Sequence, residues 1–309
     1  MSQNSEKKDI MMCCASCGKT EGDGIQLRTC TACKSVRYCG VTCQRNHRPK
    51  HKKTCKKRAA ELRDEILFRQ PESSHMGDCP ICLLPCPLSA DESAYHACCS
   101  KSVCNGCVLA NTKREVNERL GHSCPFCRAD FLIYSDDGDD DSDQKLMKRI
   151  QANDPSALSF MGGERYKEGN YVESFGYFFR AAKLGDATAH ERLSVMYLEG
   201  LGVEKDEKKE LYHLEEAAIG GHPDARYQLG INEWNKHRYD RAVKHWIIAA
   251  NLGHDQSLQE LKEAYKDEMV SKEDFASVLR AYHAAVDAMK SPQRDEAAEV
   301  FGAAGKMWS

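Results

Sequence analysis

The stretch CASCGKTEGDGIQLRTCTACKSVRYCGVTCQRNHRPKHKKTC, residues 14–55, decides how the N-terminal part of the chain folds. It orders seven cysteines and one histidine as Cys-x2-Cys, Cys-x2-Cys, Cys-x3-Cys and His-x3-Cys. In a Cys-x2-Cys pair the tight turn brings both thiolates to one side, where they reach one metal ion. Cys39 and Cys43 are predicted to lie one helical turn apart on one face, as are His51 and Cys55. Eight such ligands suffice for two closed tetrahedral sites, and thiolate in every pair favours zinc.

The distribution of cysteine along the 309 residues supports a metal protein. All 17 cysteines lie between Cys13 and Cys127, so the chemistry of the chain changes near residue 130. An odd count with repeated Cys-x2-Cys spacing favours metal ligands over disulfides. The N-terminal residues MSQNSEKKDI lack the apolar core of a signal peptide, and no run of 18 apolar residues suggests a membrane helix. We therefore expect an intracellular protein, cytoplasmic or nuclear, that is neither secreted nor membrane-bound.

The ligand order of residues 13–55 resembles the MYND zinc finger, with Tyr-Cys-x3-Cys-Gln at 38–44 and His-Lys-x2-Cys at 51–55. The resemblance implies two interleaved zinc sites and, as partners, short proline-containing peptides. His47 stands where the family often has Trp and is an alternative ligand, whereas Cys13 is expected to be a spare thiol. The implied ligands are Cys14, Cys17, Cys39 and Cys43 for one zinc, and Cys30, Cys33, His51 and Cys55 for the other.

A second cysteine cluster resembles a RING finger, in an all-cysteine variant, over residues 79–133. The implied ligands of one zinc are Cys79, Cys82, Cys104 and Cys107; Cys124 and Cys127 bind the other zinc with two ligands from the middle. Cys98 and Cys99 are the favoured pair, with His96 and then Cys86 as alternatives. Adjacent residues point apart in an extended chain, so this pair requires a kinked backbone. Together the two clusters predict four Zn2+ ions.

The RING resemblance also implies a partner and a function. Ile81 and Pro125 stand where such fingers contact a ubiquitin-conjugating enzyme, and Arg128 stands where a cation bridges that enzyme and ubiquitin. A RING ligase has no catalytic side chain, because it accelerates transfer by orienting the enzyme and its thioester-linked ubiquitin. We expect a ubiquitin ligase. The alternative is a non-catalytic adaptor or a transcriptional co-regulator built from the same modules.

Two connecting segments differ in charge. Residues 56–75 are predicted to be helical, because Leu62, Ile66 and Leu67 repeat among charged residues until Pro71. Residues 134–144 are predicted to be an acidic disordered linker, since repelling carboxylates with Gly and Ser build no core. The basic run 45–58 favours a solvated helix face, and nucleic-acid binding is not expected from a single basic helix without an aromatic platform.

Residues 145–305 repeat a helix–turn–helix pattern. Alanine pairs at 181–182, 217–218 and 249–250 recur 36 and 32 residues apart, and glycines follow each pair where the second helix must stop. Small residues at the start of each unit keep the same spacing: Ala157, Ala189, Ala225 and Ser257.

These units resemble Sel-like repeats, relatives of tetratricopeptide repeats, which bind proteins and perform no chemistry. A fourth helix pair is expected at 255–266 and 272–289, with a capping helix near 293–303. The predicted fold is multidomain: two small zinc-stabilised cross-brace fingers with short strands and helices, followed by an all-α helical-repeat solenoid.

Overall fold

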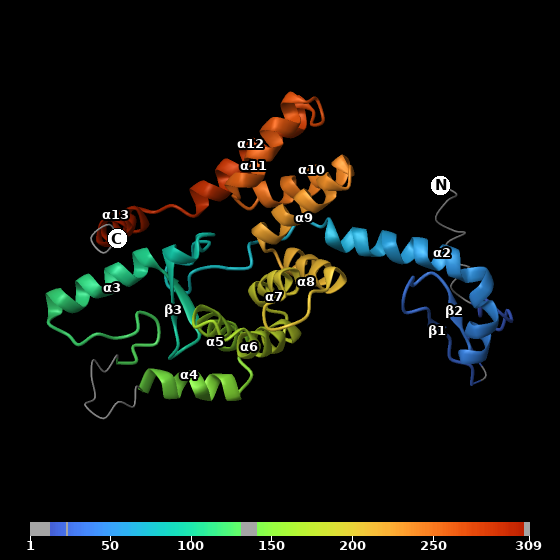
Figure 1. The fold of residues 1–309 in the computed structure, drawn as a ribbon, viewed down its shortest axis with the longest axis horizontal. Helices are drawn as coiled ribbons and strands as arrows, with labels where there is room; N and C mark the ends of the chain where they lie inside the picture. The colour runs from blue at the N-terminus through green and yellow to red at the C-terminus, as the bar shows by residue number, and fades with distance from the viewer. Residues whose placement is uncertain (1–12, 23, 131–140, 306–309) are drawn as a thin grey trace. The chain divides into compact units, whose positions relative to one another are not determined.

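A computed structural model of the chain describes residues 13–22, 24–130 and 141–305. The chain divides into two compact units between Arg69 and Gln70. The short strands and the long helix of the first unit can be followed in Figure 1. The second unit holds the other cysteine cluster together with all the repeat helices. Among the described residues, no helix combines the length and apolar character needed to cross a bilayer.

The first unit contains β1 (Arg28–Thr29), paired antiparallel with β2 (Arg37–Tyr38), and helix α2 (Val41–Leu67). Its small core consists largely of ligand residues, with Leu27 and Tyr38 buried among Cys14, Cys30 and Cys33. Few apolar side chains are available here to stabilise the fold by themselves.

Helix α2 differs from two expectations. Gly40 caps it in an extended conformation, so Cys39 lies before the helix and only Cys43 lies on its first turn. The helix also continues without a break from the ligand region to Leu67. Of the separate helix expected over 56–75, residues 56–67 are therefore the second half of α2, and residues 68–75 are not helical. Pro49 lies inside it and removes only one backbone donor.

The second cysteine cluster surrounds a hairpin and a helix. The 3-10 turn η1 (Ala90–Glu92) leads into β3 (Ser93–His96), which pairs antiparallel with β4 (Lys101–Cys104). Helix α3 (Asn105–Glu118) follows directly. The hairpin turn spans residues 97–100, and Ser100 adopts a left-handed φ of 52°. This turn supplies the backbone kink that the sequence required at Cys98 and Cys99.

The repeat region consists of ten helices within the described residues. Antiparallel pairs form between consecutive helices, most extensively between α5 and α6, α7 and α8, and α9 and α10. Neighbouring pairs stack on one another, which makes a helical solenoid (Figure 1). The helices are α4 (Asp141–Gln151), α5 (Pro155–Lys167), α6 (Tyr171–Lys183), α7 (Ala187–Glu199), α8 (Glu207–Ile219), α9 (Pro223–Asn235), α10 (Tyr239–Ala250), α11 (Asp255–Lys266), α12 (Lys272–Ala288) and α13 (Pro292–Gly305).

Equivalent residues of the repeats occupy equivalent places. Small residues at the start of four helices are fully buried, as are most of the alanines in the paired positions, so facing helices approach closely. Gly185, Gly221 and Gly253 each follow a second helix with φ between 85° and 90°, a conformation that disfavours any side chain. The buried small residues are Ala157, Ala189, Ala225 and Ser257.

The ends of the repeat region depart from expectation in two places. Helix α4 begins at Asp141, so residues 141–144 are helical, while the rest of the expected acidic linker lies largely outside the described residues. Helices α11 and α12 match the expected fourth pair. Helix α13 was expected to cap the solenoid, but it packs on α3 of the cysteine cluster instead (Figure 1).

Candidate metal centres and partner groove

The structure gathers fifteen of the 17 cysteines and one histidine into four quartets, in each of which the potential ligand atoms lie within 4.8 Å of one another. Each finger uses its first and third ligand pairs for one quartet and its second and fourth pairs for the other. The quartets are Cys14–Cys17–Cys39–Cys43, Cys30–Cys33–His51–Cys55, Cys79–Cys82–Cys104–Cys107 and Cys98–Cys99–Cys124–Cys127.

The sulfur separations fit a tetrahedral ion. Contacting sulfur atoms within the quartets have Sγ–Sγ distances from 3.4 Å for Cys98 and Cys127 to 3.9 Å for Cys79 and Cys107. Four thiolates at about 2.3 Å from a zinc ion are about 3.8 Å apart, whereas a disulfide needs about 2.05 Å. None of the 17 cysteines, all within the described residues, forms a disulfide. The donor set therefore suits zinc, and the clusters indicate a zinc-binding protein.

The only histidine in a quartet, among the described residues, has an environment suited to a ligand. His51 is buried, its Nε2 lies 3.2 Å from Cys33 Sγ, and its ring stacks on His47 with centroids 5.6 Å apart. Burial, with the nearby charges of His47 and Arg48, lowers the pKa of His51 and favours the neutral imidazole that a metal requires. His47 itself contacts Tyr38 Oη at 3.1 Å, so it supports the ligand ring and lies outside the quartet.

The fourth quartet contains Cys98 and Cys99, the favoured pair of middle ligands. Cys99 Sγ lies 3.8 Å from Cys124 Sγ, and Cys98 Sγ lies 3.4 Å from Cys127 Sγ. His96 is buried on β3 and lies outside this group. Cys86 and Cys13 also lie outside all four quartets, and burial raises the pKa of Cys86 to about 11, as suits a protonated core thiol.

A groove lies between the two zinc loops and helix α3. It encloses about 330 Å3 and brings together Ile81, Pro125 and Arg128, the three residues for which the RING resemblance implied partner binding. Ile81 is 41% exposed, so it offers apolar surface to this groove. The remaining lining residues are Cys82, Gly106, Cys107, Ala110, Asn111, Arg114 and Gln293.

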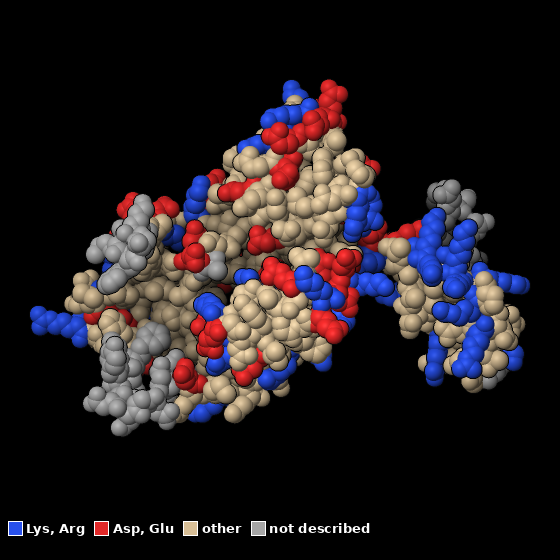
Figure 2. Space-filling model, viewed as in Figure 1, with Lys and Arg blue, Asp and Glu red and all other residues tan. Residues whose placement is uncertain are grey.

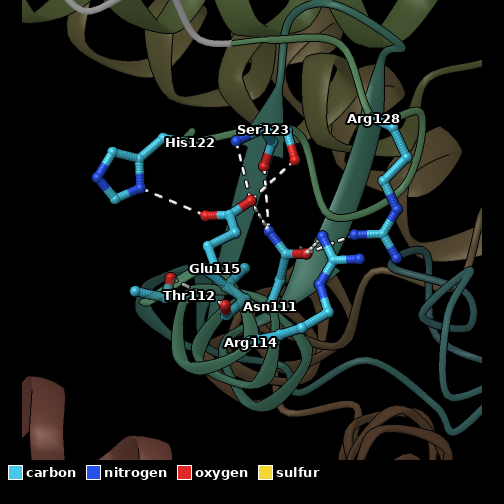
Figure 3. A network of polar contacts seen from close by, with 8 residues as sticks. Asn111, Thr112, Arg114, Glu115, His122, Ser123 and Arg128 are labelled. Carbon is cyan, nitrogen blue, oxygen red and sulfur yellow. Dashed lines mark hydrogen bonds and ion pairs between the residues drawn. The ribbon is translucent and has the colours of Figure 1, made fainter. Parts of the chain in front are cut away.

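A hydrogen-bond network fixes the polar wall of this groove (Figure 3). Asn111 Oδ1 accepts from the guanidinium groups of both Arg114 and Arg128. On its other side, Asn111 Nδ2 donates to Glu115 Oε1 at 2.7 Å and to the Ser123 carbonyl at 3.1 Å. Arg128, which has a left-handed φ of 61°, is thereby tied to α3.

Glu115 connects the helix to the loop that precedes the last ligands. Its Oε1 accepts from Ser123 N at 2.9 Å and from Ser123 Oγ at 2.8 Å, and its Oε2 lies 3.3 Å from His122 Nδ1. Burial alone raises the pKa of Glu115, but the hydrogen bonds from Ser123 and Asn111 outweigh it and the pKa ends below its usual value. A charged carboxylate therefore anchors the loop of Cys124 and Cys127.

Neither this network nor the contact with α13 was predicted. Asn111 and Glu115 are four residues apart on one helix face, a spacing that offered a local indication of contact. No local pattern marks Gln293, which reaches the groove from a helix far along the chain.

The two units also differ in charge. Residues 13–69 hold fourteen Lys or Arg against five Asp or Glu, whereas acidic residues outnumber basic ones in residues 70–309. In Figure 2 the charged side chains seen on the first unit are mainly Lys and Arg, whereas the second unit shows both signs. Seven of the nine Lys and Arg residues of α2 are exposed and the other two are half-buried, which is consistent with a solvated helix face.

Comparisons with known proteins identify two of the modules. The MYND finger model matches residues 14–55, and the Sel1 repeat model matches residues 155–186, 187–222 and 223–254. Residues 79–130 lie outside these matches. Both matching resemblances stated from the sequence are thus confirmed.

Three individual proteins show partial similarity. Chitin synthase regulator SKT5 of Saccharomyces cerevisiae is 31% identical over 93 residues, which are 28% of this chain and 13% of that protein. A Sel1 repeat protein from Oxalobacter formigenes matches with 23% identity and a TM-score of 0.38, over 48% of this chain and 64% of that one. A protective antigen of uropathogenic Escherichia coli with an SLR fold matches with 19% identity and a TM-score of 0.36, over 51% and 35%.

The chain spans less than two thirds of each of these proteins. The MYND match covers the finger that holds the first two quartets, and the Sel1 matches cover helices α5 to α10. The chain contains a MYND finger at residues 14–55 and three Sel1 repeats at residues 155–254.

Proposed function

We propose that the chain is a RING-type ubiquitin ligase. In this proposal the module of residues 79–130 binds a ubiquitin-conjugating enzyme, while the MYND finger and the repeats bind protein substrates. The carrying observation is the groove, in which an exposed apolar residue, a proline and an arginine from both zinc loops line one cavity. These are Ile81, Pro125 and Arg128.

The proposed activity is orientation, and the groove residues have distinct roles in it. Ile81 and Pro125 offer apolar surface to the conjugating enzyme, and Arg128 offers a cation to ubiquitin. The substrate lysine amine then attacks the thioester carbonyl; the C–N bond forms as the C–S bond breaks and the enzyme thiol leaves. Holding both reactants in one geometry lowers the entropic part of that barrier.

Four Zn2+ ions, one per quartet, complete the proposal. Zinc, when bound, cross-links loops that have too few apolar contacts to hold one geometry. Such thiolate sites require reduced cysteines, which agrees with the proposed intracellular location in the cytoplasm or nucleus.

Reconstituted ubiquitination tests the proposal. The full chain is mixed with activating enzyme, a panel of conjugating enzymes, ubiquitin and ATP. We expect autoubiquitination with at least one conjugating enzyme and a loss of about tenfold or more in Ile81→Ala and Arg128→Ala. Leu83→Ala is the matched control, because Leu83 is 72% exposed in the same loop but does not line the groove. No product with any enzyme would remove the ligase proposal.

A second candidate is a non-catalytic adaptor or transcriptional co-regulator. One observation favours it: the guanidinium of Arg128 already donates to Asn111, so this cation is engaged within the module. In that case the module would bind its protein partners but would not transfer ubiquitin to them. This candidate predicts partner binding that survives Arg128→Ala together with no ubiquitin transfer.

A further inference from the structure

The start of helix α13 contacts helix α3 backbone to backbone. A Cβ atom on Gly106 would lie 2.9 Å from Arg294 N and 3.0 Å from the carbonyl carbon of Gln293. Only glycine permits this approach, because such distances are shorter than those that real Cβ atoms adopt. Farther along the same pair, Lys113 forms an exposed ion pair with Glu296.

Arg294 enters the loop of the third quartet. Its Nη1 donates to Pro85 O at 2.7 Å and to Met289 O at 2.6 Å. Its Nη2 donates to Leu84 O at 3.3 Å and lies 3.4 Å from Cys82 Sγ. Arg294 is only 9% exposed, so these acceptors replace water around a buried cation.

The same helix also reaches the partner groove. Gln293, next to Arg294, lines the cavity with Ile81 and Arg128. The loop held by Arg294 begins at Cys82, directly after Ile81, and its next residue Leu83 has a left-handed φ of 58°. The position of Ile81 therefore depends on contacts made from outside the cysteine cluster.

We propose that Arg294 is a positioning residue and Gln293 a specificity-determining residue for this groove. Arg294 donates to the Leu84 and Pro85 carbonyls and to the Cys82 sulfur, which holds the zinc loop and Ile81 in place. Gln293 lines the groove, so the bound partner must accommodate this residue. The Gln293 role rests on the proposed function, in which the partner is a ubiquitin-conjugating enzyme. Helix α13 thus couples the end of the repeat region to the groove.

Thiol alkylation of the zinc-loaded full chain tests the Arg294 role without any partner. N-ethylmaleimide modification of each cysteine is followed by mass spectrometry. Removing a hydrogen-bond donor to a metal ligand weakens metal binding by about 10- to 100-fold, so Arg294→Ala should speed alkylation of the third quartet by about tenfold or more. The other three quartets should keep wild-type rates. Arg294→Lys should be intermediate, since an ammonium lacks the planar fork.

Lys113→Ala is the matched control, because it removes the exposed ion pair on the same helix contact and leaves Arg294 in place. It should alkylate like the wild type. The Arg294 role is overturned if Arg294→Ala matches this control. It is also overturned if all four quartets accelerate equally, since the effect would then be global unfolding and not a local loss of support.

Binding of purified conjugating enzymes tests the Gln293 role. Gln293→Ala should change the dissociation constant of the enzyme that binds the wild type by about fivefold, which corresponds to about 1 kcal/mol, at unchanged zinc content. An unchanged constant overturns the role. If no conjugating enzyme binds the wild type, the proposed function fails together with the Gln293 role, whereas the alkylation result still decides Arg294 independently.

Discussion

The cysteine clusters and the repeats reach a defined fold by different physical routes. The core of the first finger contains Leu27 and Tyr38 among three cysteines, so ligand residues make up most of it. The repeat core instead contains residues such as Leu193, Met196 and Phe178, all almost fully buried. The difference shows that one chain can rely on metal cross-links in one region and on apolar burial in another. Perturbations that affect one region and leave the other intact therefore test this difference.

Metal removal should have the largest effect. A strong chelator should abolish hydrogen-exchange protection in peptides from 14–55 and 79–130, because structural zinc contributes about 10–16 kcal/mol to such folds. Peptides from 155–264 should remain protected, since their core is apolar. Hydrogen exchange with mass spectrometry measures both in one sample. Equal loss in the repeats would contradict the comparison.

Truncation of a buried repeat residue should have the next largest effect. Leu193 is fully buried, so Leu193→Ala should lower the free energy of unfolding by about 2–5 kcal/mol. Leu184 is 50% exposed, and Leu184→Ala should change the free energy of unfolding by less than about 0.5 kcal/mol. Urea unfolding followed by circular dichroism compares the two variants. The zinc content should stay constant in both.

Two adjacent glycines of α5 provide a smaller and sharper test of packing. A Cβ on Gly162 would lie 2.9 Å from the Phe178 ring, so Gly162→Ala should destabilise the repeats by about 1–2 kcal/mol. Gly163 has nothing within 4 Å of its Cβ position, so Gly163→Ala should stabilise by about 0.5–1 kcal/mol through helix propensity. Thermal unfolding should therefore shift in opposite directions for the two variants. Unfolding temperatures that shift in the same direction for both variants would contradict the close packing of Gly162 against Phe178.

A buried histidine should give the smallest effect. Burial, followed by the charges of His190 and Lys209, lowers the pKa of His213 to about 4. The unfolded chain binds a proton near pH 6.5 and the folded chain does not, so stability is present above that pH and falls as the pH drops toward 4. Between pH 7 and 6 the loss is at most about 0.7 kcal/mol. Urea unfolding at both pH values should show a smaller loss in His213→Gln, and an unchanged loss would exclude His213 as the cause.

Local patterns predicted much of the architecture. The spacing of Ala and Gly predicted the repeat helices, because closely packed helices require small residues such as Ala and left-handed turns favour Gly. Helix α13 could not be placed in this way, since its contact partner Gly106 lies in a different module. The ligand quartets follow sequence spacing, whereas the Asn111–Glu115 network depends on the loop at Ser123 returning to α3. The start of α2 after Cys39 was missed because the Cys-x3-Cys spacing fits a helix equally well.

Native mass spectrometry of the full chain, purified under reducing conditions, tests the central claim most directly. Four quartets of convergent ligand atoms predict a mass excess of four zinc ions. Cys124→Ser should lower the excess by one ion, and Cys30→Ser should do the same in the first unit. A wild-type excess of two ions, both unaffected by Cys124→Ser, would contradict the assignment of residues 79–130 as a zinc module.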